Sequence, residues 1–419
     1  MSSFERYRAF DYEFPGTTLA WQLSGRGFES LRLAELPRPK PGPEDVAFRV
    51  DSNSLCFSDT KVVAAGPEHP RLAGYDMAKD KVVLGHEISI ALIEVGPKAL
   101  PSMRLHGRYI VQADLYKYNT AVGYAVWGGM LQYGVFDRRV QEYLIPVEGD
   151  IGYSTASLVE PWACIEASYA RCEILPADET FWVMGGGGPM GQMHVLRALA
   201  MKRAGALPAL RHLIISEPSR ERLDAVGRRL EDIARDAGVA LVLLDPTSPA
   251  FDNEMRAVAP NGVDYCVACA PVPQVVVDCR RYVGRYGVLN VFAGLKRGTG
   301  PVNLGDIHYD QHTVTGNTGS RLLDMQRVLA KAERGELDTD ASAAAVVGMR
   351  EADKGLRAVA EGTITNKIVL YPQLPDLPLT LLADLPSRAR FDGGTAAELK
   401  AGRWSRTAEA ELFDAFLRL

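Results

Sequence analysis

The stretch that decides the fold is Thr180-Phe-Trp-Val-Met-Gly-Gly-Gly-Gly-Pro-Met-Gly191. Its first five residues have the composition of a buried strand, its glycines follow the spacing G-x-G-x-x-G, and residues 192–201 continue with helical periodicity. Glycine permits backbone angles and close approaches that a side chain would prevent, and a helix N-terminus directs free N–H groups at a phosphate. The stretch therefore predicts the strand, tight turn and helix of a dinucleotide-binding unit. The residues expected at the cofactor are Gly186, Gly188, Pro189, Met190 and Gly191.

The next predicted strand, residues 211–216, ends at Glu217. A carboxylate there would accept hydrogen bonds from an adenosine ribose diol, which favours NAD. The spacing from Gly191 to Glu217 is 26 residues, longer than the usual value of about 20, and residues 203–210 form the expected extra loop. Arg220 and Arg222 could accept a 2′-phosphate, so NADP stays an alternative.

Bulk composition describes an ordinary globular protein. The 419 residues suggest two or three domains, with 47% apolar and 24% charged residues. A net charge of −5 and a pI near 5.9 argue against nucleic-acid or membrane partners. The N-terminus lacks an apolar signal core, so a cytoplasmic location is expected. Six cysteines are too few for a disulfide framework, and Cys266 and Cys269 are interpreted as packing residues despite their redox-like spacing.

The pattern of predicted elements changes along the chain. Residues 1–171 read as short strands cut by Pro and Gly, which predicts an irregular, GroES-like β-barrel. Residues 172–313 alternate strand and helix, which predicts a doubly wound parallel sheet of the Rossmann type, with Ala293 and Gly294 after its last strand at the nicotinamide. Residues 314–372 should return to the first domain, and residues 373–419 form a C-terminal extension. The later expected elements are a helix over 322–334, a helix over 341–360, a strand over 367–371 that could rejoin the barrel, a linker over 373–388 and a helix over 395–419.

Chemistry-bearing residues recur in the first domain. Cys56-Phe-Ser-Asp59 comes about thirty residues before Gly85-His-Glu87, and Leu158-Val-Glu-Pro161 follows later. A thiolate, an imidazole and one or two carboxylates suit a catalytic zinc ion that keeps one position open. Each residue alone is more often an ordinary core or surface group. Their occurrence in this order, in a chain that also has a predicted dinucleotide-binding domain, favours a metal site over three unrelated residues.

These three motifs, together with the glycine turn Gly186–Gly191, resemble the zinc-dependent medium-chain dehydrogenase/reductase superfamily over residues 20–372. The resemblance implies one catalytic zinc per chain, held by Cys56, His86 and Glu160, with Glu87 as an alternate ligand or outer group. It also implies that Asp59 orients His86 or the metal-bound water, and that Ser58 relays the proton of the substrate hydroxyl.

Two departures from the family pattern affect these expectations. No cysteine lies between Glu87 and Glu160, so the second, structural zinc of many relatives is not expected. Lys61 stands where relatives often have a relay histidine. Lysine is a poor neutral relay because its ordinary pKa is about 10.4. Contact with an anionic substrate, proton relay and a solvated side chain all remain open for Lys61.

Longer stretches are most like the L-sorbose-1-phosphate reductases and related sugar, polyol and cyclitol dehydrogenases, including Asp51-Ser-Asn-Ser-Leu-Cys56 and Gly402-Arg-Trp-Ser405. The hypothesis is reversible hydride transfer between a nicotinamide cofactor and a secondary alcohol of a polyhydroxylated small molecule. Tyr124, Trp127, His308 and Asn317 are further candidates for substrate contact. A homo-oligomer, dimer or tetramer, is expected. A zinc-free enone reductase on the same fold and a non-catalytic dinucleotide-binding protein are the alternatives.

Overall fold

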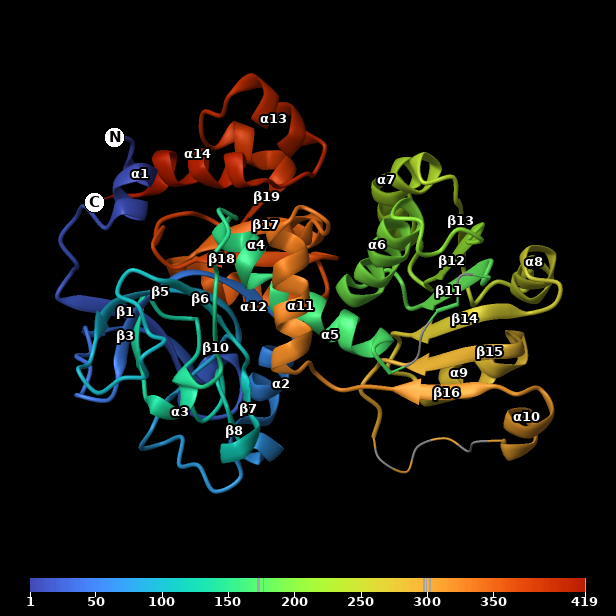
Figure 1. The fold of residues 1–419 in the computed structure, drawn as a ribbon, viewed down its shortest axis with the longest axis horizontal. Helices are drawn as coiled ribbons and strands as arrows, with labels where there is room; N and C mark the ends of the chain where they lie inside the picture. The colour runs from blue at the N-terminus through green and yellow to red at the C-terminus, as the bar shows by residue number, and fades with distance from the viewer. Residues whose placement is uncertain (172–173, 176, 297, 299, 301–302, 419) are drawn as a thin grey trace. The chain divides into compact units, whose positions relative to one another are not determined.

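The computed structural model describes residues 1–419 apart from 172–173, 176, 297, 299, 301–302 and 419 (Figure 1). The chain forms two compact units: unit 1 is Met1–Pro161 with Arg321–Leu419, and unit 2 is Trp162–Ser320. The boundaries expected from the sequence, 171/172 and 313/314, lie within ten residues of these. Helix α5 (Val159–Tyr169) begins in unit 1 and continues into unit 2.

Unit 2 contains a six-stranded parallel sheet in the order β13-β12-β11-β14-β15-β16. The chain passes from β11 to β12 on one side and later places β14 on the other side, so β11 and β14 define the switch point where such sheets bind ligands. This confirms the predicted Rossmann-type sheet. Its elements are β11 (Thr180–Met184), α6 (Pro189–Arg203), β12 (His212–Ser216), α7 (Arg220–Asp236), β13 (Ala240–Leu244), α8 (Phe251–Val258), β14 (Val263–Ala268), α9 (Pro273–Asp278), β15 (Val283–Val291), α10 (Leu304–Tyr309) and β16 (Thr313–Gly316).

Unit 1 is built on a mixed sheet in the order β10-β6-β5-β3-β18-β17-β19, with β9 also paired to β3. A three-stranded sheet, β2-β1-β4, and a short β7-β8 pair complete it. The central strand β3 is buried along its whole length. The strands are β1 (Thr17–Leu23), β2 (Leu31–Pro37), β3 (Val46–Leu55), β4 (Val82–Val83), β5 (Glu87–Val95), β6 (Arg108–Val111), β7 (Asp114–Leu115), β8 (Thr120–Ala121), β9 (Tyr133–Phe136), β10 (Leu144–Pro146), β17 (Ala343–Gly348), β18 (Lys367–Tyr371) and β19 (Thr380–Leu381).

Helices of unit 1 cover this sheet and its ends. The terminal helices α1 and α14 pack against each other although they lie at opposite ends of the chain (Figure 1). The helices are α1 (Ser3–Ala9), α2 (Phe57–Ala65), α3 (Arg138–Gln141), α4 (Tyr153–Ser157), α11 (Leu322–Glu333), α12 (Ala352–Glu361), α13 (Gly393–Lys400) and α14 (Arg406–Phe416).

Several predicted elements need correction. The helix expected over 341–360 is wrong in its first half, because residues 343–348 form β17, which pairs with β18 and β19. Alanine is the strongest helix former, but intrinsic propensity is a small effect, and pairing inside a sheet overrides it here. Residues 373–388 are not an open linker but contain β19 and a 3-10 helix, η8 (Leu382–Ser387). The single terminal helix is two helices, α13 and α14, separated near Gly402, whose φ is +72°. The strand β18 does rejoin the first domain by pairing with β3.

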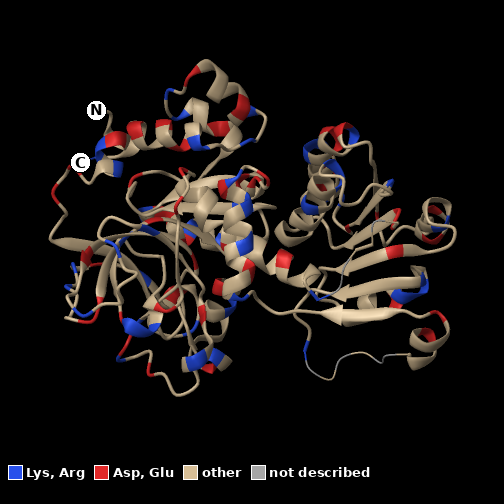
Figure 2. Cartoon of the chain, viewed as in Figure 1, with Lys and Arg blue, Asp and Glu red and all other residues tan. Residues whose placement is uncertain are grey.

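Charge and cysteine placement agree with an ordinary globular interior and surface. Lys and Arg alternate with Asp and Glu in both units (Figure 2). Within the described part of the chain, no helix is long and apolar enough to span a bilayer. Cys266 and Cys279 are buried in unit 2, and Cys172 lies outside the described residues.

Two buried carboxylates bond to residues of α4: Glu409 on α14, in the C-terminal extension, and Asp340 on the 3-10 helix η6 (Thr339–Ser342). Asp340 accepts a hydrogen bond from the Thr155 hydroxyl at 2.6 Å. Burial raises the pKa of the Asp340 carboxyl to about 7, and the neighbouring Glu409 and Asp338 carboxylates act in the same direction. Ionised Asp340 is therefore a cost to the folded state at neutral pH.

We predict that Asp340→Asn removes a pH-dependent loss of stability. The folded pKa of Asp340 is above its unfolded value, so the native state binds more protons and stability falls as pH rises from about 4 to about 7. A shift of about three units corresponds to at most about 4 kcal/mol. Urea unfolding at pH 5 and pH 8 should show a smaller decrease for the variant than for the unaltered protein. Equal decreases would contradict this account of Asp340.

Candidate active site

Asp59 fixes the segment that carries Cys56. Cys56 follows the end of β3 and stands immediately before α2, in which Asp59 is the third residue. The Cys56 N–H donates to Asp59 Oδ2 at 3.2 Å, which satisfies one of the free N–H groups at the helix start. The Asp59 side chain is fully buried. The local sequence thus holds the thiol at the point where the strand becomes a helix.

The same carboxylate fixes His86. Its Oδ1 accepts the Gly85 N–H at 3.2 Å and lies 3.0 Å from His86 Nδ1. Gly85 has a φ of +95°, which a side chain would disfavour, and this turn delivers His86 just before β5. With Nδ1 directed at Asp59, the imidazole presents Nε2 as its free ligand atom.

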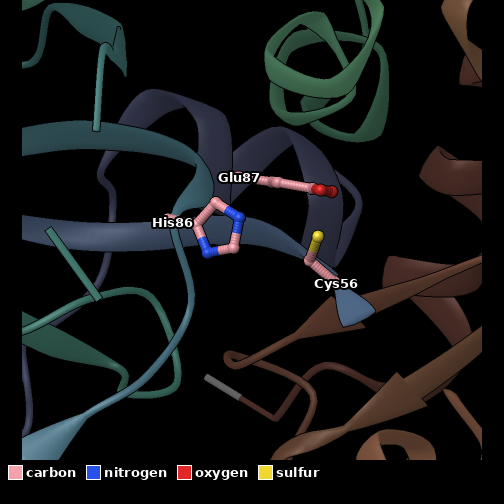
Figure 3. A group of neighbouring side chains, drawn as sticks. All are labelled: Cys56, His86 and Glu87. Carbon is pink, nitrogen blue, oxygen red and sulfur yellow. The ribbon is translucent and has the colours of Figure 1, made fainter. Parts of the chain in front are cut away.

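Cys56, His86 and Glu87 converge. One potential ligand atom from each lies within 4.8 Å of the other two, and Figure 3 shows the three side chains turned toward a common space. Burial lowers the pKa of His86, but Asp59 and Cys56 raise it more, so the net pKa lies well above the ordinary value. One sulfur, one nitrogen and one carboxylate oxygen form a donor set that suits zinc. The residues present therefore fit the metal that the sequence motifs predict.

Two groups that sequence reasoning missed hold Glu87. Lys367, at the start of β18, donates through Nζ to Glu87 Oε1, and the Ser54 hydroxyl donates to Oε2. Lys367 is 4% exposed and Glu87 1% exposed. Burial lowers the pKa of Lys367, but Glu87 and Cys56 more than offset this and hold the ammonium charged. The sequence does contain one sign of this role: Lys367 is a charged residue at the start of an otherwise apolar strand, Lys367-Ile-Val-Leu-Tyr371.

Glu160 is the second residue of α5 and falls outside the group of three, although it was the carboxylate expected to bind metal. Burial raises the pKa of Glu160 to about 7, while His86 lowers it and Glu87 raises it. Glu160 is therefore close enough to both residues to interact electrostatically. Glu160 thus interacts with the group of three electrostatically but is not one of the side chains whose ligand atoms converge.

Ser58 and Lys61 lie on the same helix but in different surroundings. Ser58 Oγ is 3.0 Å from Cys56 Sγ and 3.1 Å from His86 Nε2, so its hydroxyl adjoins both ligand atoms. Lys61 is exposed, and its Nζ lies 5.5 Å from the centre of the Phe57 ring. Ser58 is thus positioned to exchange a proton at the site. Lys61 lacks the burial that would help it carry one as a neutral amine.

In unit 2 the glycine turn leaves space for a ligand. A Cβ on Gly191 would lie 2.6 Å from Gly186 Cα, so this glycine permits close packing of the turn against α6. A Cβ on Gly188 would meet only one protein atom, at 3.9 Å, so the backbone is open there. Gly188 directly precedes Pro189, the first residue of α6. An anion at the helix N-terminus fits this arrangement.

Glu217 lies beside that turn. It is buried, follows the last residue of β12, and its Oε2 would be 2.4 Å from a Cβ on Gly187. Arg220 is 79% exposed and pairs with Asp224 at 3.0 Å. The Glu217 carboxylate therefore adjoins the glycine turn, which is where an acidic residue that binds the ribose is expected.

The remaining candidates divide into two groups. Tyr124 is buried, and its ring centre lies 6.2 Å from that of His86. Trp127 donates to the Lys81 carbonyl at 2.8 Å, and the Asn317 amide donates to the carbonyls of Cys164 and Gly319. His308 lies on α10, with its ring 4.8 Å from that of Tyr309. Of these four, Tyr124 adjoins the candidate metal site.

The residues predicted at the nicotinamide lie just after β15. Ala293 donates its N–H to the Ala268 carbonyl at 2.8 Å, and Gly294 is the next residue.

Comparison with known proteins agrees with this geometry. The chain is 27% identical to L-sorbose 1-phosphate reductase of Klebsiella pneumoniae over 94% of this chain and 97% of that protein. It is 24% identical to mannitol-1-phosphate 5-dehydrogenase of Aliivibrio fischeri over 87% and 89%. Among solved structures, 2R,3R-butanediol dehydrogenase of Bacillus subtilis matches with a TM-score of 0.69 and 20% identity, over 85% of this chain and 99% of that one.

A putative zinc-binding dehydrogenase of Sinorhizobium meliloti, bound to NADP, matches with a TM-score of 0.66 and 17% identity over 85% of this chain and all of that one. No profile of a protein family matches the chain. The fold and the site define an oxidoreductase with a metal-binding unit and a dinucleotide-binding unit. These relatives and solved structures support the resemblance of the chain to the medium-chain dehydrogenase/reductase superfamily.

We predict that the stabilising effect of Lys367 depends on zinc. Lys367→Met would leave Glu87 buried without its counter-charge, which costs about 3–5 kcal/mol in the metal-free protein. A bound cation beside Glu87 would replace that counter-charge, so the loss should be clearly smaller in zinc. The measurement is urea unfolding with and without zinc.

Arg49→Met provides the matched control. Arg49 and Asp51 form another buried ion pair in unit 1, with Nε and Oδ1 2.8 Å apart. Arg49→Met should therefore lower the free energy of unfolding by the same amount with and without zinc. If the Lys367→Met loss is also independent of zinc, Glu87 does not lie at the metal.

Proposed function

We propose that this protein transfers hydride reversibly between NAD and a secondary alcohol of a sugar, polyol or cyclitol, most often in phosphorylated form. The observation that carries the proposal is the convergence of Cys56, His86 and Glu87 in a chain that also has an open glycine turn. The relatives named for L-sorbose 1-phosphate and mannitol 1-phosphate support the substrate class. A zinc-free enone reductase would have no use for this set of ligand types.

The proposed ligands are Cys56 and His86 with a carboxylate from Glu87 or Glu160. When bound, zinc supplies a Lewis acid that acidifies an alcohol or polarises a ketone, and NAD supplies the hydride acceptor. Asp59 keeps the His86 ring in one orientation through Nδ1. Ser58 would relay the alcohol proton: its Oγ, which lies within hydrogen-bonding distance of both Cys56 and His86, accepts that proton while its own hydroxyl proton passes to water.

A group of basic side chains beside the site supports a phosphorylated substrate. The Arg71 guanidinium lies 5.0 Å, and the His69 ring 5.4 Å, from the Tyr124 ring, which itself packs near His86. Partial burial lowers the pKa of His69, and the positive charges of Arg71 and Lys61 lower it further. Arg71 also lines a surface cavity of about 440 Å³ and pairs with Asp114 there. Arg71 would supply the positive charge for a phosphate at the substrate's far end, and the neutral His69 ring could donate a hydrogen bond to it.

Two less specific features complete the proposal. The cytoplasm is the proposed location. A homo-oligomer is proposed because β16 is the last strand of its sheet, where exposed backbone groups favour pairing with a second chain, and Val314 on it is 40% exposed. Sedimentation velocity tests this, and a monomer at micromolar concentration would contradict it.

Turnover with a panel of polyols, cyclitols and their phosphates tests the proposed activity. We expect zinc-dependent reduction of NAD with at least one polyhydroxylated alcohol, and a preference for NAD because Glu217 repels a 2′-phosphate. Glu217→Ser should weaken NAD binding and reduce that preference. A tenfold preference for NADP, about 1.4 kcal/mol, would contradict the role of Glu217. Failure of every substrate with the zinc-loaded protein would contradict the function.

Lys61→Met and Arg71→Met should separate phosphate contact from proton relay. Loss of a charge-assisted hydrogen bond, about 1.5–3 kcal/mol, should raise KM for a phosphorylated substrate about tenfold or more and leave the unphosphorylated sugar nearly unchanged. Lys98→Met is the control, because Lys98 follows the end of β5 at Val95, whereas His86 precedes its start. This variant should change the KM for neither substrate. A lower kcat on neutral substrates with a shifted pH profile would instead identify Lys61 as a relay.

A further inference from the structure

Helix α4 is capped by a residue from the other end of the chain. Gly152 precedes α4 and has no side chain to bond the first N–H groups of the helix. The N–H groups of Tyr153 and Ser154 instead donate to the two carboxylate oxygens of Glu409, at 2.7 and 2.8 Å. A Cβ on Gly152 would lie 3.1 Å from Glu409 Oε2, so glycine leaves room for the incoming carboxylate.

The carboxylate of Glu409 is itself firmly held. Its side chain is fully buried, and Oε1 accepts a third hydrogen bond, from the Tyr371 hydroxyl, at 2.8 Å. A second bond links the same segment to α4, because Trp404 Nε1 donates to Ser154 Oγ at 3.0 Å. Hydrogen bonds to a buried ionised group are among the stronger ones in proteins. Two independent contacts therefore fix the start of α4 to the C-terminal extension.

The position of α4 determines where Glu160 can lie. Helix α4 ends at Ser157, Leu158 is its C-cap, and α5 begins at Val159 with Glu160 next. Leu158 and most of α4 are buried, and Thr155 is bonded to Asp340, so this short connection has little freedom to absorb a shift. A displacement at Tyr153 would therefore reach Glu160, whose carboxylate interacts electrostatically with His86 and Glu87.

We propose that Glu409 is a positioning residue for the metal site: through α4 it sets the placement of Glu160, so that the C-terminal extension is part of the active-site framework. The inference rests on the proposed function only in taking Glu160 to lie at the metal. Glu409 contacts neither substrate nor metal. Its effect should appear as altered metal coordination, beyond any general loss of stability.

The test is metal binding by Glu409→Gln. A glutamine can accept only one of the two N–H bonds and presents its own N–H₂ to the other. We expect zinc affinity, measured by competition with a chromophoric chelator, to fall about tenfold, as for other residues that orient metal ligands. The visible absorption bands of the cobalt-substituted protein should also shift, because they report ligand geometry.

Glu411→Gln is the matched control on the same helix. Its carboxylate also accepts hydrogen bonds, from the Asp392 N–H and the Thr395 hydroxyl, both at 2.7 Å, but these lie at α13. Zinc affinity and the cobalt spectrum should be unchanged in this variant. If Glu409→Gln does not fold, Trp404→Phe is the alternative variant, because it removes the hydrogen bond to Ser154 Oγ and keeps an aromatic ring. The zinc affinity of Trp404→Phe should also fall.

Unchanged affinity and spectrum in whichever of these two variants folds, or an equal change in Glu411→Gln, would overturn the inference. Failure of the unaltered protein to bind zinc would instead overturn the proposed function, and this inference with it. Zinc binding by the unaltered protein therefore distinguishes failure of this inference from failure of the proposed function.

Discussion

The buried carboxylate of Asp59 is the contact on which the candidate site depends. It accepts the backbone N–H groups of Cys56 and Gly85 and lies against His86 Nδ1. These partners come from two segments, one at the end of β3 and one before β5, so a single side chain aligns the thiol and the imidazole. The pairing of β3 with β5 brings the two segments together, and Asp59 adds the contacts that orient their side chains.

A second constraint is charge balance around the metal site. Two carboxylates, Glu87 and Glu160, are buried within electrostatic reach of each other, with Lys367 as a buried counter-charge. Buried charges are tolerated only when paired or bound to a cation. A bound divalent cation would add positive charge beside these two carboxylates, which is the kind of pairing that buried charges require.

Sequence reasoning identified what local patterns encode. The glycine spacing predicts the turn before α6, and the short motifs around Cys56 and His86 identify both residues as candidate zinc ligands. It could not identify Lys367, because the strand β18 reaches β3 only through a pairing of distant segments. For the same reason residues 343–348 were expected to be helical, since their alanines carry no sign of the neighbours on either side. Glu409 lies more than 250 positions from the N–H groups it accepts, and no local pattern could reveal that contact.

The central claim is that Cys56 and His86 bind a catalytic zinc ion with a carboxylate from Glu87 or Glu160. The most direct measurement is anomalous diffraction at the zinc edge from crystals of the purified protein. The account predicts one strong peak per chain, about 2.3 Å from Cys56 Sγ and about 2.1 Å from His86 Nε2, with one of the two carboxylates completing the protein ligands. A zinc peak elsewhere in the chain, or no peak at these residues in zinc-supplemented crystals, would contradict it.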